Sequence, residues 1–339
     1  MKITPLQRHQ QGLSLVELMI AITLSLVLTL GVIQIFSSSK QTNRVQSSLG
    51  GVQENARFAL DILSYDLRMA GNIGCNSTIA VNNNAAANNL PPIGNGITGY
   101  ERTQLGAAVF PLLDNSAIPS SANVVAETDV VVLRYAAANA RAVANTTTVT
   151  TIQLASSISA KNGDPLIISD CQSADIFIAN TGSNTLADVA TINLATGSPN
   201  LSKVYGQGAE VARLKYVAYY IRTDAEGYRN LYRSEVNGIT GSLGIMDPDP
   251  LLQGVDDMQL LYGERLNSGN IRYVPADTAG INMNNITSVR LSLLLSTLEK
   301  NLTSDSQKYW QNGVQPVASS TNSDKKLLRG FTTTVQLRN

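Results

Sequence analysis

The chain is poor in the side chains on which most catalytic chemistry depends. It has a single histidine, His9, and two cysteines, Cys75 and Cys171, among 339 residues. Ser-His-Asp and Cys-His mechanisms need a histidine beside the nucleophile, and a metal site needs more ligands than two thiols. We therefore expect no enzyme activity, no catalytic residue, no metal and no cofactor.

Charge is also scarce. Charged residues make up 15% of the chain, and 25 basic side chains balance 25 acidic ones. Nucleic-acid-binding proteins usually concentrate basic charge, so this composition argues against a nucleic-acid binder, and we expect no direct binding of nucleic acid. Gly50-Gly51 lacks the following Lys-Ser/Thr of a phosphate-binding loop. The hydrophobic fraction of 43% is enough to build a core.

The N-terminus carries the one long apolar run. Residues 1–12 are polar and include Lys2 and Arg8, whereas residues 13–36 are apolar apart from Glu17. As a helix, the apolar run reaches roughly 36 Å, enough to cross a hydrocarbon core of about 30 Å. Basic residues before the run predict a cytoplasmic leader, one membrane anchor, and the bulk of the chain on the far side.

Three interpretations of this run compete. A secretory signal peptide has a shorter apolar region and a small-x-small cleavage site, which Ile35-Phe36-Ser37-Ser38-Ser39 does not match. A plain signal anchor does not need an acid near its start. Glu17 discriminates between these interpretations. Placing a carboxylate at the centre of a spanning helix costs about 2–3 kcal/mol of free energy, so such an acid normally has a partner.

The segment GLSLVELMIA at residues 12–21 resembles the class III signal of type IV prepilins and type II secretion pseudopilins. The resemblance implies that a prepilin peptidase cuts between Gly12 and Leu13, that the new amine of Leu13 is N-methylated, and that Glu17 is the acid used in assembly. Leu13 departs from the family, in which phenylalanine is commoner.

The spacing has its own physical reason. After cleavage, the amine of Leu13 and the carboxylate of Glu17 lie four residues apart, about 6 Å along a helix. In a staggered bundle, Glu17 of one subunit can meet the amine of its neighbour. In a medium of low dielectric this pairing offsets a desolvation cost that neither charge could bear alone.

An amphipathic pattern continues the predicted helix. From residue 41 to residue 70 the apolar positions recur in steps of three and four, as one face of a helix requires. Gly50-Gly51 weakens its middle, where the helix can bend. Arg57 and Asp61 are placed for an i,i+4 ion pair. The apolar positions that recur between residues 41 and 70 are Val45, Leu49, Val52, Ala56, Ala59, Leu60, Leu63, Leu67 and Ala70.

Further blocks look like PilW-type minor pilins and extend that resemblance over most of the chain. They are NARFALDIL at 55–63, DLRMAG at 66–71 with GC at 74–75, DCQSADIF at 170–177, GVDDMQLLYG at 254–263 and FTTTVQLRN at 331–339.

After the helix the patterns indicate strands. Residues 76–99 are rich in Asn and Ala and predict a surface loop. Alternating runs predict a strand over 209–222, a turn at 224–227 and a strand over 229–235. Other strands are expected at 129–135, 147–154, 165–169, 175–179, 255–263, 288–298 and 331–337.

Helices do not alternate with these strands, so we expect an α+β fold: a long N-terminal helix packed on an antiparallel, pilin-like head. The domains are then a leader (1–12), the pilin helix (13–70, with 13–36 as transmembrane segment or filament core) and a β-rich head (71–339). We expect an elaboration of the head into two lobes that meet near residues 198–208.

Two sites in the head remain open. In an oxidising periplasm Cys75 and Cys171, each beside a PilW-like block, would form a disulfide that stabilises by roughly 4 kcal/mol; the alternative is two separate buried thiols. Asp247, Asp249 and Asp256-Asp257 could suggest calcium, but Asp-Pro pairs usually mark turns and no Asp-x-Asp-x-Asp-Gly loop is present.

The resemblance implies a minor pilin that primes type IV pilus assembly and stays at the filament tip. Its partners would be the prepilin peptidase, other minor pilins, the major pilin, the inner-membrane assembly platform and a tip adhesin for cell adhesion. It would move from the bacterial inner membrane, with the head in the periplasm, to the pilus. The alternative is a type II secretion pseudopilin, similar to pseudopilin J.

Overall fold

The structure is a computed structural model. It describes residues 14–74, 80–83, 94, 96–101, 125, 128–196, 199–235, 250–305, 307, 309 and 324–338. The chain divides into two compact units, Met1–Gly50 and Gly51–Asn339, which are described separately. The helix α1 (Leu15–Met69) contributes residues to both units.

In the first unit, α1 is an apolar helix with exposed side chains. Its most apolar stretch has a mean hydropathy of 2.4 and is not covered by other parts of the chain. Length and composition therefore suit a membrane span. The predicted helix is confirmed with its start at Leu15, and α1 continues through Gly50 and Gly51.

In the second unit, α1 packs through the face that the sequence pattern predicts. Val52, Ala56, Ala59, Leu63 and Leu67 are buried in one core cluster with residues of the sheets. Small alanines let the helix approach the strands closely. The expected ion pair between Arg57 and Asp61 does not form in the structure, where both side chains point into solvent.

The helix ends at Met69, where the following backbone at Gly71 lies close to Gly96 and Arg134. Gly71 has a φ of 77°, a conformation that glycine adopts without strain, and follows the last turn as a C-terminal cap. A side chain on Gly96 would collide with the backbone of Gly71. The amide of Gly71 donates to the carbonyl of Arg134 (2.9 Å), so the end of α1 is bonded to the neighbouring strand.

The strands follow the helix along the chain. They are β1 (Ala80–Asn83), β2 (Ile97–Tyr100), β3 (Val130–Ala136), β4 (Arg141–Ala142), β5 (Thr151–Ala160), β6 (Pro165–Ser169), β7 (Ser173–Asn180), β8 (Ala187–Leu194), β9 (Glu210–Thr223), β10 (Arg229–Glu235), β11 (Pro250–Gln253), β12 (Val255–Arg265), β13 (Ile271–Val274), β14 (Ile286–Ser296) and β15 (Leu328–Gln336), with a 3-10 turn η3 (Met283–Asn285) before β14.

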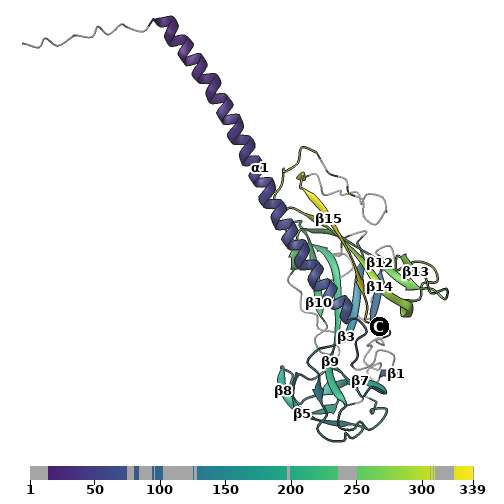
Figure 1. Cartoon of the computed structure of the whole chain (residues 1–339). Coiled ribbons are helices and arrows are strands. Elements are labelled where there is room, and N and C mark those ends of the chain that lie inside the picture. Colours follow the sequence, from purple (N-terminus) through teal and green to yellow (C-terminus); the bar gives the residue numbers. More distant parts are fainter. Residues whose placement is uncertain are drawn as a thin grey trace, which may run out of the picture. The chain divides into compact units, whose positions relative to one another are not determined.

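The long strand β9 organises the larger sheet, whose order is β11-β10-β9-β6-β7-β8-β5. The first part of β9 pairs with β4 and β6, and its second part pairs with β3 and β10, all antiparallel. In Figure 1, β5, β7 and β8 gather around the lower end of β9. Only one pair of described strands, β1 with β7, is parallel.

A second, four-stranded antiparallel sheet has the order β13-β12-β14-β15. Asp129, just before β3, joins this sheet to the larger one. Its amide donates to the carbonyl of Met258 (2.9 Å), and Oδ2 of its side chain accepts from the amide of Leu260 (2.7 Å). The two sheets therefore form one head with α1 packed against them.

Three apolar clusters fill the head. One joins residues 52–69 of α1 and the following Ala70 to both sheets, a second lies on the other face of β3, β9 and β10, and a third fills the space among β5, β6, β7 and β8. Alternation along β9 explains the first two, since Val217, Tyr219 and Ile221 face one cluster and Tyr216, Ala218 and Tyr220 face the other.

The predicted α+β class is confirmed as one long helix and largely antiparallel sheets. The predicted strands are present, and the turn at 224–227 joins β9 to β10, with the amide of Gly227 donating to the carbonyl of Asp224. The expected loop over residues 76–99 is wrong where β1 and β2 form. Both are short edge pieces whose pairing with β7 and β3 compensates for a polar, Gly-containing sequence.

Candidate functional site

Glu17 lies in the first turn of α1, where the sequence predicted an acid used in assembly. The amide of Glu17 donates to Oγ of Ser14 (3.2 Å), and the amide of Leu18 donates to the carbonyl of Ser14 (3.1 Å). Ser14 is thus the N-cap, and Ser-x-x-Glu is the pattern of a capping box. The exposed carboxylate stands at the positive end of the helix dipole, which stabilises its negative charge.

Gly12 and Leu13 lie outside the described residues. Cleavage between them and methylation of Leu13 therefore stay predictions.

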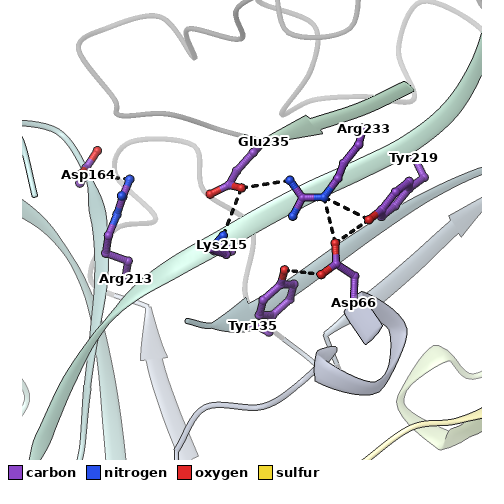
Figure 2. A network of polar contacts seen from close by, with 8 residues as sticks. All are labelled: Asp66, Tyr135, Asp164, Arg213, Lys215, Tyr219, Arg233 and Glu235. Carbon is purple, nitrogen blue, oxygen red and sulfur yellow. Dashed lines mark hydrogen bonds and ion pairs between the residues drawn. The ribbon is translucent and has the colours of Figure 1, made fainter. Parts of the chain in front are cut away.

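A second polar site joins α1 to the sheet. Asp66, in the last turns of α1, is only 3% exposed. Its carboxylate accepts hydrogen bonds from the hydroxyls of Tyr135 (2.7 Å) and Tyr219 (2.6 Å) and from Nε of Arg233 (3.0 Å). These donors come from β3, β9 and β10, so one side chain of the helix binds three adjacent strands (Figure 2).

The electrostatics of this site favour the bonded arrangement. Burial, and then the negative charge of Asp66, raises the pKa of both Tyr135 and Tyr219 above the usual phenol value, so both hydroxyls remain donors. Burial alone would lower the pKa of Arg233, but Tyr219 and Asp66 outweigh this effect and raise it. The buried carboxylate is thus paired and fully hydrogen-bonded, which is the condition for a stable buried charge.

The network extends along the strands (Figure 2). Nη1 of Arg233 contacts Glu235 at 3.2 Å, and Nζ of Lys215 contacts the same carboxylate oxygen at 3.3 Å. Arg213 and Asp164 form a separate ion pair at 3.3 Å. The charges around Asp66 therefore alternate in sign from the helix outward.

Asp66 was not predicted as a site from the sequence. A signal was present, because Asp66 falls on the buried face of α1 between Leu63 and Ala70. An acid on an apolar face predicts a buried partner, but the partners lie far along the chain and could not be identified from spacing.

The predicted disulfide falls partly outside the described residues, because Cys75 is not among them. Cys171 lies in the turn between β6 and β7, with a φ of 56°. A side chain on Gly74 would come within 2.5 Å of Oγ of Ser169. The disulfide stays a prediction.

Of the acids considered for calcium, the structure describes only Asp256 and Asp257. Asp247 and Asp249 lie outside the described residues, whereas Asp256 and Asp257 are buried at the start of β12. Oδ1 of Asp257 accepts from Gln259 (3.1 Å), and burial raises the pKa of Asp257 to about 6. In the described part of the chain no three His, Cys, Asp or Glu side chains gather into a metal-binding group.

Comparison with protein families identifies two segments. Residues 7–33 match the prokaryotic N-terminal methylation motif, which includes Gly12, Leu13 and Glu17. Residues 218–339 match type IV pilus-assembly protein W, PilW. The chain matches a PilW-type pilin with a prepilin signal. No curated protein and no solved structure gave a significant match.

The PilW-type segment begins near the end of β9 and includes β10 to β15, and thus the whole second sheet. It contains Tyr219 and Arg233, two of the three donors to Asp66. The helix and the PilW-type segment therefore meet at this polar site. The match describes an assembly component of the pilus and supports the expectation of a structural protein.

Proposed function

We propose that this protein is a minor pilin that primes type IV pilus assembly and occupies the filament tip. The observation that carries the proposal is a methylation motif that begins an exposed, membrane-capable helix in a chain that ends in a PilW-type segment. Motif and helix fit anchoring in the inner membrane. The proposed organisation is a leader (1–12), the pilin helix (13–70) and a pilin-like head (71–339) in the periplasm.

The mechanism begins with cleavage between Gly12 and Leu13. The new amine of Leu13, once methylated, remains cationic, and the exposed carboxylate of Glu17 in a neighbouring subunit can pair with it. The apolar side chains of α1 are exposed and so are free to pack against other pilin helices. Packing and charge pairing together favour the transfer of the helix from lipid into a bundle.

The proposed partners follow from this mechanism. They are the prepilin peptidase, the inner-membrane assembly platform, other minor pilins, the major pilin and a tip adhesin. The alternative role, a minor pseudopilin of type II secretion similar to pseudopilin J, uses the same signal and helix. The PilW match favours the pilus, and the neighbouring genes discriminate between the two.

Intact mass spectrometry of the protein from cells, combined with fractionation of sheared pili, tests the proposal. We expect loss of residues 1–12, a gain of about 14 Da for one methyl group, and a trace amount of the protein in the pilus fraction. A full-length precursor in wild-type cells, or a mature protein that is absent from pili, would refute the proposed role.

A further inference from the structure

A cavity of about 300 Å³ opens on the head beside the end of α1. The segment after α1, the turn after β3, strand β6 and the start of β9 surround it. Ligand pockets in proteins begin at about this volume. The cavity is large enough for one long side chain and too small for most cofactors.

Alanine and isoleucine side chains form part of the cavity wall, the polar Asn72 and Ser169 also line it, and its rim carries an acid. Ile73, Ala136, Ile167 and Ala212 line it, and all four are at least 95% buried members of one apolar cluster. Glu210, the first residue of β9, lies at its exposed rim. Such a lining suits a ligand with an aliphatic stem and a charged end.

The carboxylate of Glu210 is available to a ligand. No side chain in the described part of the chain bonds to it, although its backbone pairs with Ala142 and Ser169. Arg141, on the adjacent strand, does not reach it, since its guanidinium donates to the carbonyls of Ser157 (2.9 Å), Asn139 and Ala140. A cation from another molecule would therefore complete this rim.

We propose that this cavity receives an arginine side chain of another pilus subunit. Its methylene stem would pack on the alanine and isoleucine walls, and its planar guanidinium would donate two hydrogen bonds to the carboxylate of Glu210. This inference rests on the proposed function for the identity of the partner. The chemistry of the cavity, a partly apolar slot with an acidic rim, does not depend on the identity of the partner.

The chemistry is tested on the full mature protein in detergent micelles, with ¹³C-methyl alanine as the reporter. N-acetyl-arginine amide is compared with N-acetyl-citrulline amide, which has nearly the same shape and no charge. We expect the methyl signals of Ala136, Ala138 and Ala212 to shift with the arginine probe alone. Equal shifts with both probes, or no shift at these methyls, would overturn the proposal.

A pair of variants tests the role of the carboxylate. Glu210→Gln should weaken binding of the arginine probe by at least about tenfold, because a charge-assisted hydrogen bond is lost. Glu226→Gln, which neutralises an exposed acid in the turn after β9, should leave binding unchanged. An equal effect of the two variants would mean that net charge, and not this cavity, attracts the probe.

The partner is tested in assembled pili. A photo-crosslinking p-benzoylphenylalanine replaces Ala138, an exposed residue that lines the cavity. We expect a crosslink to an arginine-containing peptide of a pilus subunit, lost with Glu210→Gln. If the protein is present in pili but this crosslink is missing, the inference fails and the proposed function stands. If the protein is absent from pili, the proposed function fails, and the probe titration still decides the chemistry.

Discussion

The carboxylate of Asp66 in α1 lies 3.0 Å from Nε of Arg233 in β10. The two residues are far apart in the sequence, and the pair joins the helix to the PilW-type segment. An ion pair at this depth tolerates the loss of neither partner, since the remaining charge stays buried.

The first prediction concerns this ion pair. Asp66→Ala should lower the free energy of unfolding by about 3–5 kcal/mol, because Arg233 and two tyrosine hydroxyls lose their acceptor. Chemical denaturation of the mature protein in detergent measures the change. Asp61→Ala removes an exposed acid from the same helix and should cost no more than about 0.5 kcal/mol. Equal losses would show that Asp66 contributes helix charge only.

The second prediction concerns Glu17. Glu17→Ala should leave cleavage of residues 1–12 largely intact and should strongly reduce the number of pili, since the amine of Leu13 then lacks its partner. Mass spectrometry reports the cleavage, and electron microscopy counts the pili. Glu54→Ala, in an exposed part of the same helix, is the matched control. A normal pilus number in the Glu17 variant would rule out charge pairing as the assembly mechanism.

The third prediction concerns the cysteines. We expect Cys75 and Cys171 to be bonded, so that an alkylating reagent adds no label to the unreduced protein. Reduction, or Cys171→Ser, should lower the free energy of unfolding by roughly 4 kcal/mol in the chain-entropy description. Intact mass after alkylation and denaturation curves measure both effects. Two labelled thiols in the folded protein would contradict the bond.

The fourth prediction concerns pH. Burial, reinforced by the neighbouring Glu101, raises the pKa of Asp129 to about 9 from its usual 3.8. Between about pH 4 and pH 9, the side chain of Asp129 therefore holds a proton in the folded head and releases it in the unfolded chain. The contribution of protonated Asp129 to stability is fully present below about pH 4 and is lost as the pH rises through about 9.

Thermal unfolding at pH 6 and pH 9.5 measures this dependence. The Tm should fall by at least about 3 °C at the higher pH, the shift that roughly 1 kcal/mol produces in a domain of this size. Asp129→Asn keeps an acceptor for the amide of Leu260 and removes the titrating group. If that variant shows the same decrease in Tm, other groups cause it.

The spacing of apolar residues predicted much of the fold, because that spacing follows from the geometry of a single helix or strand. The steps of three and four identified the buried face of α1, and the two-residue period identified β9 and its turn to β10. The strands β1, β2, β4, β8, β11 and β13 were not predicted. For β1 and β2 the reason is that their pairing with β7 and β3 depends on distant residues.

The candidate sites also differ in how far the sequence could predict them. Glu17 was predictable because an acid in an apolar run is anomalous within a few residues of sequence. The acidic-rimmed cavity and the partners of Asp66 were not predictable, because each site forms only when segments from four separate regions of the chain come together.

The sequence by itself determined that the chain begins with a prepilin-type signal and an apolar helix, because both are continuous stretches read residue by residue. Only the tertiary structure decided that Asp66 is bound by three strands and that Glu210 borders an apolar cavity. Burial and hydrogen bonding depend on which distant segments fold together, and no local pattern encodes that choice.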